Sequence, residues 1–325
     1  MLERLKEVRI PAANALTHTD AMAIYQALQP FMPAPQNGLC QRATRLIDIL
    51  TEFDGLILDG HGVVNLGNEP IDGIAELLDA AAGMAKPVLI LTNGASLPST
   101  RAFAKYQKWR LQIACDDVLS SRDALVGQLE DSLQIQLMSK ERIGVFGRSI
   151  ETLVGSQFMT YGRNDNFWQI GDAFVFLGGV DWNEADQAAF ERAMQECPRP
   201  LHVANPDVTA PQANGKFSAE PGYWTARMMQ RLAKREIPME VNWYGKPYRP
   251  AFDMALNRMK IRLGGTIDHK RIAMVGDSLH TDILGAGSAG MTTVLITDHG
   301  LFQNGTALAY CEACGIHPDW IVDTL

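Results

Sequence analysis

The chain has 325 residues, 46% of them hydrophobic, which is enough to bury a large core and to form two domains. Its net charge of −8 disfavours a nucleic-acid-binding role, because such proteins usually present a basic face. No apolar run reaches the roughly 18 residues of a membrane span, and the first residues lack the order of a secretion signal. We therefore expect a cytoplasmic protein without nucleic-acid or membrane partners.

The five cysteines are scattered along the chain, except for Cys311 and Cys314, which form a CxxC pair. Such a pair can be redox-active or can form half of a zinc site, but no second Cys/His pair stands at zinc spacing. We expect ordinary reduced cysteines, as in a reducing cytoplasm.

Residues 1–50 are expected to form a helical N-terminal extension. Segments 21–28 and 41–50 carry apolar residues at helix spacing, and a proline-rich break at residues 30–35 separates them. The sequence does not indicate what this extension does.

After the extension, short apolar runs alternate with helix-like segments, which is typical of parallel βαβ units. The expected strands are residues 53–58, 87–91, 142–146, 173–177, 201–204, 271–275 and 293–296, with an edge strand at 320–325. The expected helices are residues 71–82, 99–110, 183–196, 219–234 and 279–287.

We interpret this pattern as an α/β fold in which one sheet domain is interrupted by a second α/β domain. The core domain is expected at residues 51–111 and 239–325, and the inserted domain at residues 112–238. An insertion of this length is within the usual size range of a domain.

The glycines of residues 285–290 match the GxGxxG pattern of dinucleotide-binding loops. That motif binds a pyrophosphate only when it follows a strand and begins a helix, and here the order is reversed. We expect these glycines to end a helix and to turn into the following strand.

Asp59 ends the first expected strand and is followed by Gly60 and Gly62. Open α/β sheets hold their ligands at the carboxyl ends of strands, and a flexible backbone there can turn N–H groups toward an anion. A carboxylate in this position can attack phosphorus. The alternative is a turn aspartate that caps the next element.

Thr92, Asn93 and Gly94 follow the second expected strand. A hydroxyl and backbone amides there can bind phosphoryl oxygens, or they can simply begin a helix. Lys246 stands in a loop before Pro247, where its ammonium can hold the carboxylate or can be an ordinary surface lysine.

Asp277 and Asp282 follow the strand expected at residues 271–275. Two carboxylates at this spacing suit Mg²⁺, which prefers oxygen ligands, or they can complement a helix dipole. Each of these sites is weak alone, and it is their conjunction in this chain order that indicates phosphoryl transfer.

These motifs resemble those of the haloacid-dehalogenase (HAD) superfamily, specifically its class IIA, the NagD-like and p-nitrophenylphosphatase-like phosphatases. The resemblance covers residues 52–325. The matching segments are residues 58–63, 69–73, 86–87, 91–93, 205–207, 244–247 and 275–283.

The resemblance implies a Rossmann-like core, a C2-type cap made by the inserted domain, and hydrolysis of a small phosphate ester with Mg²⁺. It also makes a homodimer one expected assembly. By position, Asp59 is the nucleophile and a Mg²⁺ ligand, the backbone carbonyl of His61 and the side chain of Asp277 are the other ligands, and Asp282 supports them. Lys246 then orients Asp59.

The implied phosphate-binding residues are Gly60, Thr92, Asn93, Gly94 and Lys246. The cap would exclude water and select the substrate, which the sequence does not identify. Polar or aromatic cap residues that either face a ligand or belong to the core or surface are Trp182, Asn205, Asp207, Tyr223 and Trp224.

His61 is a departure, because the family has an aspartate there that protonates the leaving group and then activates water. An imidazole is a capable acid and base near neutral pH, although a nearby Mg²⁺ favours its neutral form. Three outcomes stay open: a phosphatase that uses His61, a phosphotransferase with a persistent phospho-enzyme, and a catalytically impaired phosphate-ligand-binding protein. A sensor of phosphorylated ligands and a purely structural α/β domain are the remaining alternatives.

Overall fold

The computed structural model describes residues 2–136, 142–149, 153, 158–162, 167–211, 217–298, 302 and 305–325, with the side chains of residues 130–136 and 211 excepted. The chain forms two compact units. The core unit comprises residues 32–92, 99–119 and 246–325. The inserted unit comprises residues 1–31, 93–98 and 120–245.

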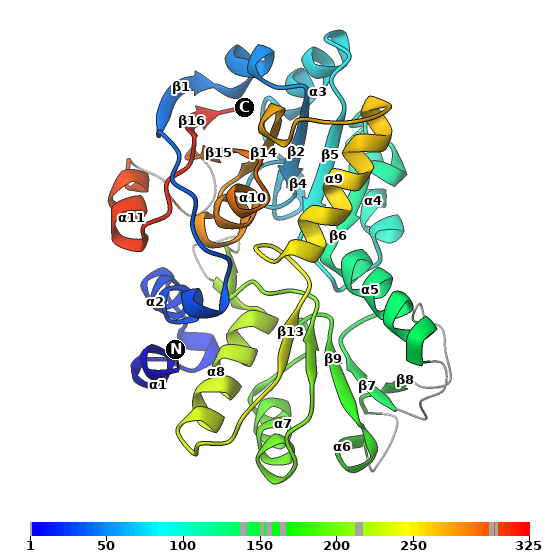
Figure 1. Cartoon of the computed structure of the whole chain (residues 1–325), viewed down its shortest axis with the longest axis vertical. Helices are drawn as coiled ribbons and strands as arrows, with labels where there is room; N and C mark the ends of the chain where they lie inside the picture. Colours follow the sequence, from blue (N-terminus) through cyan, green and yellow to red (C-terminus); the bar gives the residue numbers. More distant parts are fainter. Residues whose placement is uncertain are drawn as a thin grey trace. The chain divides into compact units, whose positions relative to one another are not determined.

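The core unit is built on a sheet that has seven strands in the described residues, in the order β1-β16-β15-β14-β2-β5-β6 (Figure 1). In this order the strands are Gln41–Arg45, Trp320–Thr324, Thr292–Ile296, Ile272–Gly276, Gly55–Asp59, Val88–Thr92 and Val118–Ser120. The neighbouring pairs from β1 to β5 are parallel. Their carboxyl ends therefore lie along one edge of the sheet.

Helices cover both faces of this sheet. They are α3 (Ile74–Gly83), α4 (Ser99–Lys108), α9 (Arg249–Leu263) and α10 (Leu284–Ser288). Successive strand side chains point to opposite faces. Leu56 and Leu58 of β2 accordingly pack with α3 and α4, whereas Ile57 packs with α9 and α10. Figure 1 shows the resulting three layers, which confirm the expected Rossmann-like α/β fold.

Shorter elements complete the core unit. They are the 3-10 helices η3 (Leu46–Glu52), η4 (Cys115–Asp117) and η7 (His269–Arg271), the hairpin strands β3 (Asn65–Leu66) and β4 (Glu69–Pro70), the π-helix η8 (Leu279–Ile283) and the helix α11 (Ala307–Cys314). Of these, the β3–β4 hairpin and η8 directly follow the strand ends that carry Asp59 and Asp277. The 3-10 helix η2 (Gln29–Phe31) ends the first segment of the inserted unit.

The inserted unit has its own parallel sheet, with the order β13-β10-β9-β7-β8 in the described residues. In this order the strands are Val241–Trp243, Leu201–Val203, Ala173–Phe176, Ile143–Phe146 and Phe158–Thr160. A separate antiparallel hairpin joins β11 (Thr209–Pro211) and β12 (Phe217–Ala219). The helices are α5 (Ser121–Gln136), α6 (Phe167–Ile170), α7 (Glu184–Glu196) and α8 (Pro221–Ala233).

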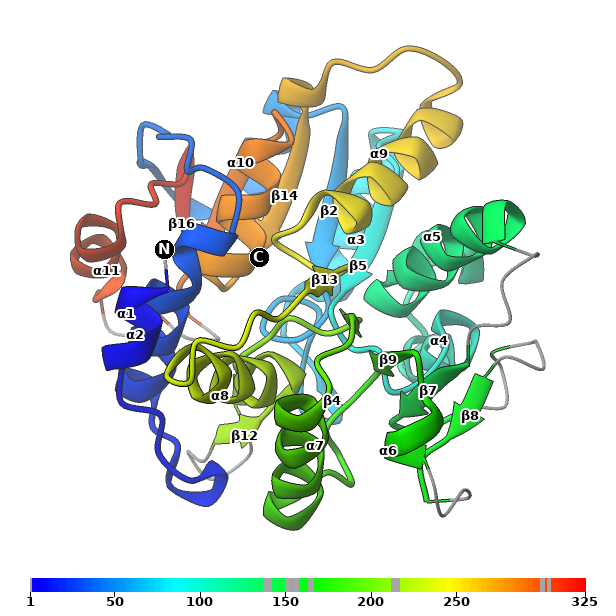
Figure 2. The ribbon, with the colours of Figure 1, turned by 60° about the horizontal axis from the view of Figure 1, so that its bottom comes forward.

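The N-terminal segment packs on α8 within the inserted unit (Figures 1 and 2). It contains α1 (Glu3–Glu7), the 3-10 helix η1 (Ala13–Ala15) and α2 (His18–Leu28). Gln230 Nε2 of α8 donates to the backbone carbonyls of Leu5 and Val8, both at 2.7 Å. Tyr223 Oη donates to the carbonyl of Pro11. Nearly all residues of α8 are buried, with the N-terminal segment covering part of the helix.

The structure corrects the expected helical extension of residues 1–50. Residues 41–45 form strand β1, whose backbone pairs in parallel with β16, and only part of the remainder is helical. Because β1 takes the outer position, the strand at Trp320–Thr324 is internal and is not the expected edge strand.

The boundaries of the two units also differ from the expected positions near residues 112 and 238. Val118 and Leu119 add strand β6 to the core sheet, so the second unit resumes only at Ser120. At the other end, β13 pairs with β10 of the inserted sheet, which extends that unit to Gly245. Backbone pairing, which apolar periodicity does not reveal, decides both boundaries.

The glycines of residues 285–290 end α10 and lead into β15, as expected, with Gly290 at φ 78°. None of the five cysteines, all of which lie in the described residues, forms a disulfide, and Cys311 and Cys314 are buried on α11. Among the described residues, no helix is long and apolar enough to cross a membrane.

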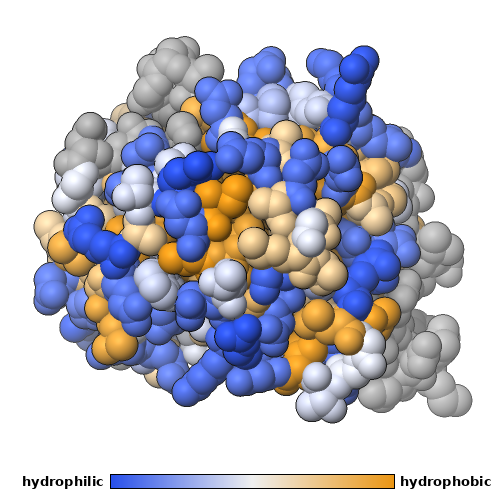
Figure 3. All heavy atoms as spheres, turned by 90° about the horizontal axis from the view of Figure 1, so that it is seen from above, coloured by the Kyte–Doolittle hydropathy of each residue, from blue (hydrophilic) through white to orange (hydrophobic). Residues whose placement is uncertain are grey.

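Hydrophobic side chains reach the surface in the middle of the face shown in Figure 3, between hydrophilic ones. Over the described residues, the large hydrophobic side chains with the greatest exposed fractions are Leu39 (80%) and Ile261 (67%). Apolar atoms form much of any protein surface, so these single residues do not by themselves indicate a binding site.

Candidate active site

Asp59 is the last residue of β2, and its side chain is largely buried. Its Oδ1 accepts a hydrogen bond from the backbone N–H of Gly60 at 2.7 Å and another from Lys246 Nζ at 2.6 Å. Within the described residues, Oδ2 accepts no hydrogen bond. The carboxylate is thus held through one of its two oxygens.

Lys246 lies directly after the inserted unit and is 2% exposed. Its Nζ donates to Asp59 Oδ1 at 2.6 Å and to Asp282 Oδ1 at 2.5 Å. Burial alone would lower the pKa of Lys246, but the charges of Asp282 and Asp59 raise that pKa above its ordinary value. The lysine is therefore a buried cation between two carboxylates, and its role in orienting Asp59 for a reaction stays a prediction.

Asp282 is fully buried on η8. Besides Lys246, the backbone N–H of Ser278 donates to its Oδ2 at 3.1 Å. Burial raises the pKa of Asp282 to about 7, and the charge of Asp59 adds to this effect while Lys246 opposes it. With both oxygens already bonded, Asp282 is suited to positioning Lys246 and the loop after β14.

Asp277 follows β14 and lies against the loop after Asp59. A Cβ added to Gly62 would come within 2.3 Å of Asp277 Oδ2, and Gly62 has a φ of +94°. Glycine is the residue that tolerates both the conformation and this close approach. The Gly60–Asn65 loop is closed by hydrogen bonds from the N–H groups of Val64 and Asn65 to the carbonyl of Gly60.

One carboxylate oxygen from each of Asp59, Asp277 and Asp282 lies within 4.8 Å of the others. Over the described residues, this is the one such group of three acidic, His or Cys side chains. Hard oxygen donors without sulfur or imidazole suit Mg²⁺. The residues present thus fit the cofactor expected from the sequence.

Thr92 ends β5, the strand next to β2, and its side chain faces Gly60. A Cβ on Gly60 would lie 3.3 Å from Thr92 Oγ1. This hydroxyl therefore lies beside the residue that follows Asp59, and its role in binding phosphate stays a prediction. His61 is half-buried in the Gly60–Asn65 loop and forms a β-bridge with Asn65.

Asn93 and Gly94 belong to the inserted unit. The Asn93 side chain donates to Asp207 Oδ1 at 2.8 Å, and its backbone carbonyl accepts from Ser121 Oγ at 2.9 Å. Both contacts tie the first linker to the inserted unit. A role of Asn93 and Gly94 in binding phosphate stays a prediction.

The other cap residues singled out in the sequence divide into two groups. Trp182 packs against Phe146 in an aromatic cluster, with ring centroids 4.8 Å apart, while Tyr223 and Trp224 are buried on α8. Asn205 is part of a polar network, because its Oδ1 accepts from the N–H of Asp207 and its Nδ2 donates to Glu220.

Sequence reasoning missed Lys105 and Tyr106, two residues of α4 that lie beside the loop after Asp59. Lys105 Nζ donates to Asn65 Oδ1 at 2.9 Å and lies 4.7 Å from the centroid of the Tyr106 ring. Tyr106 is fully buried. Their signal in the sequence was weak, since both stand inside an ordinary amphipathic helix pattern.

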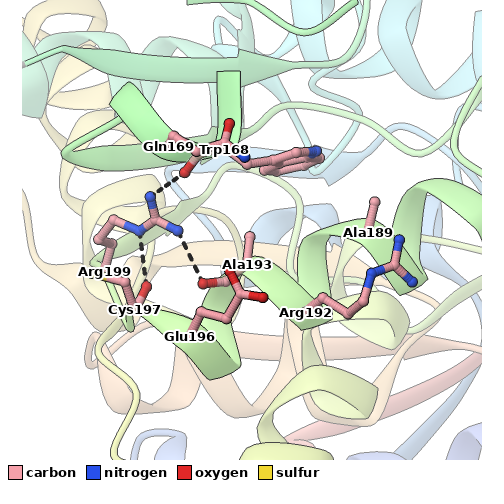
Figure 4. A pocket seen from close by; sticks show the side chains of 8 residues that line it. All are labelled: Trp168, Gln169, Ala189, Arg192, Ala193, Glu196, Cys197 and Arg199. Atoms are coloured by element: carbon pink, nitrogen blue, oxygen red, sulfur yellow. Dashed lines mark hydrogen bonds between the residues drawn. The ribbon is translucent and has the colours of Figure 1, made fainter. Parts of the chain in front are cut away.

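A separate pocket of about 440 Å³ lies in the inserted unit, between α6 and α7 (Figure 4). Its lining residues are Trp168, Gln169, Ala189, Arg192, Ala193, Glu196, Cys197 and Arg199. Arg199 donates to the backbone carbonyls of Cys197, Ala193 and Trp168. Its guanidinium thus links α6 to the end of α7 at this pocket. The acidic cluster around Asp59 is not part of it.

Comparison with known proteins agrees with this geometry. A family of haloacid dehalogenase-like hydrolases matches residues 56–152, and a HAD-hydrolase-like family matches residues 243–325. These two segments contain Asp59, Thr92, Lys246 and the acidic pair after β14. An acid sugar phosphatase of Staphylococcus haemolyticus is 24% identical over 250 residues, which cover 75% of this chain and 85% of the relative.

Solved structures share the fold. A possible sugar phosphatase from Cytophaga hutchinsonii has a TM-score of 0.74 at 24% identity, covering 88% of this chain and 98% of that one. A glycerol phosphate phosphatase from Mycobacterium tuberculosis, in complex with magnesium, has a TM-score of 0.63 at 23% identity, with coverages of 85% and 77%. Because the two family matches together cover more than half of the chain, the chain belongs to the haloacid-dehalogenase superfamily of hydrolases.

Proposed function

We propose that this enzyme hydrolyses small phosphate monoesters in two steps, through an aspartyl-phosphate on Asp59 and with Mg²⁺ as cofactor. The observation that carries the proposal is the state of Asp59: its Oδ1 is fixed by Gly60 and Lys246, and its Oδ2 has no hydrogen-bond partner in the described residues. The phosphatase names of the relatives support the same class of reaction.

In the first step, Asp59 Oδ2 attacks phosphorus and the bond from phosphorus to the ester oxygen breaks. Thr92 Oγ1 donates to a phosphoryl oxygen, and Lys246 keeps the Asp59 carboxylate ionised and oriented. His61 gives its proton to the departing oxygen. Mg²⁺, held by Asp59, Asp277 and the His61 carbonyl, would offset the negative charge of the phosphoryl group.

In the second step, a water molecule attacks the phosphorus of the aspartyl-phosphate, and His61 takes up its proton. Inorganic phosphate leaves and Asp59 is regenerated. An imidazole can serve as acid and then as base because its ordinary pKa is near neutral. This step depends most on His61, so a persistent phospho-enzyme is the expected behaviour if His61 cannot activate water.

The test is hydrolysis of p-nitrophenyl phosphate and a panel of sugar and glycerol phosphates, with Mg²⁺ and with EDTA. We expect turnover that requires Mg²⁺ in the wild type and a loss of about 10² to 10⁴-fold in His61→Ala. Activity that appears only in His61→Asp would show an intact phosphate site without a working acid–base group. Equal activity in EDTA would contradict the proposal.

A further inference from the structure

Tyr106 is a fully buried residue of α4 whose hydroxyl has no hydrogen-bond partner within the described residues. A buried phenol usually finds a partner, because an unpaired buried donor loses its hydrogen bonds to water without replacement. The reaction proposed above does not use this residue. Its isolated hydroxyl therefore needs an explanation.

The Tyr106 hydroxyl lies beside the residue that follows the nucleophile. A Cβ added to Gly60 would come within 3.4 Å of Tyr106 Oη and within 3.3 Å of Thr92 Oγ1. Both hydroxyls therefore lie next to the position that a side chain of residue 60 would occupy. The backbone N–H of this same glycine holds Asp59 Oδ1.

The surroundings keep the phenol protonated and its ring in place. Burial raises the pKa of Tyr106 above its ordinary value, the negative charge of Asp59 raises it further, and Lys246 opposes the shift. Lys105 lies 4.7 Å from the ring centroid, where it is held by Asn65 Oδ1. A protonated hydroxyl is a hydrogen-bond donor, and this one lies, like Thr92 Oγ1, beside the residue that follows Asp59.

We propose that the Tyr106 hydroxyl donates a hydrogen bond to an oxygen of the phosphoryl group bound at Asp59, next to the one donated by Thr92. This inference rests on the proposed function, since it takes the Asp59 site as the phosphoryl site. Without a phosphoryl group the Tyr106 donor is unpaired, and with one it is satisfied.

The test compares wild type with Tyr106→Phe, which removes the hydroxyl and keeps the ring. Binding of inorganic phosphate is measured by calorimetry in MgCl₂, and kcat/KM is measured with p-nitrophenyl phosphate. We expect phosphate affinity and kcat/KM to fall about tenfold each, which is the usual effect of one such hydrogen bond to a charged group. The Tm of ligand-free Tyr106→Phe should equal or exceed that of wild type, because the variant buries no unpaired donor.

The matched control is Tyr310→Phe on α11, whose ring packs against Phe302, and it should leave phosphate binding unchanged. Phosphate affinity within twofold of wild type in Tyr106→Phe would overturn the inference, and so would a clear drop in its ligand-free Tm. If the wild type binds phosphate but does not hydrolyse esters, the proposed function is contradicted. Weaker phosphate binding by Tyr106→Phe would in that case still support the inference. A wild type that does not bind phosphate contradicts both.

Discussion

Lys246 is the side chain on which both buried carboxylates of the site depend. Its single ammonium group donates to Asp59 and Asp282, which are otherwise two like charges in a region that excludes water. Taking one partner from a buried ion pair leaves an uncompensated charge, which usually costs more than the pair itself contributes. Lys246 thus stabilises the buried carboxylates, and in the proposed reaction it also orients Asp59.

Replacing this ammonium by an apolar side chain of similar length, Lys246→Met, should reduce kcat/KM by at least about 100-fold and the free energy of unfolding by about 3 kcal/mol. Urea unfolding in EDTA and in Mg²⁺ checks the second effect, and Mg²⁺ should restore part of the stability. Lys260→Met, an exposed lysine of α9, is the control and should behave as wild type. Equal stabilities for the two variants would contradict the role of Lys246.

Alanine substitutions at Gly62 and Gly67 separate the effect of backbone strain from that of steric crowding against Asp277. Gly62→Ala puts a methyl group 2.3 Å from Asp277 Oδ2 at a φ of +94°, whereas Gly67→Ala has a φ of +60° and open space around the added methyl. Gly67→Ala should cost about 1 kcal/mol through strain alone. Gly62→Ala should cost more and should also weaken Mg²⁺ binding, measured by calorimetry. Unchanged Mg²⁺ affinity in Gly62→Ala would show that Asp277 is not a ligand.

The buried imidazole of His202, on β10, should make the free energy of unfolding depend on pH. Its Nδ1 lies 2.6 Å from Tyr244 Oη, and burial lowers the pKa of His202 below 6.5. The unfolded chain therefore takes up this proton first as the pH falls. The contribution of the neutral imidazole is complete above about pH 6.5 and is lost progressively below it, toward the folded-state pKa.

In His202→Gln, which keeps an acceptor for Tyr244, the free energy of unfolding should fall less between pH 7 and pH 5 than in wild type. Urea unfolding at each pH measures this slope. His317→Gln, in the core unit, controls for the substitution itself. A slope in His202→Gln that matches wild type would exclude His202 as a source of the pH dependence.

Most strands of both sheets could be predicted from the sequence, because their buried residues form short apolar runs. The runs that end at Asp59 and Thr92 became β2 and β5, and the glycines after Ile283 became a helix end. The prediction of a helix at residues 41–50 was wrong. Gln41–Arg45 forms strand β1, which has few apolar side chains and is held mainly by backbone pairing with β16. The short β11–β12 hairpin gave no periodic signal and was missed.

The candidate site could be predicted where its residues follow strand ends. Asp59 ends β2 and Asp277 follows β14, and parallel strands place their carboxyl ends along one edge. Asp282 lies on η8 just after β14, and Lys246 joins it to Asp59 through two hydrogen bonds. Tyr106 could not be predicted in this way. It approaches Gly60 only because α4 packs on the face of the sheet that carries Leu58, and a helix pattern does not show which loop a helical side chain reaches.

At the scale of the whole chain, the N-terminal 31 residues belong to the inserted unit although they precede the core in sequence. Their contacts with α8 include the two hydrogen bonds of Gln230 and the bond from the N–H of Val208 to Tyr25 Oη. These residues therefore stabilise the inserted unit, a role that the sequence did not indicate.

Deleting residues 1–31 should expose α8 and lower the stability of the inserted unit without unfolding the core sheet. Hydrogen exchange should show lost amide protection at residues 221–233 and unchanged protection at residues 55–59. Gln230→Ala should reproduce a smaller part of the effect, about 1 to 3 kcal/mol, because the carbonyls of Leu5 and Val8 lose this donor. Lys234→Ala, at the exposed end of α8, is its control. Full protection of α8 after the deletion would contradict this role.

The claim on which the whole account depends is that Asp59 carries the phosphoryl group. The direct measurement is acid quenching of the enzyme during turnover of a phosphate ester, followed by reduction with borohydride and peptide mass spectrometry. We expect the reduced product, homoserine in place of aspartate, at residue 59 in wild type and nowhere in Asp59→Asn. A phosphoryl group on another residue, or full hydrolytic activity in Asp59→Asn, would contradict the account.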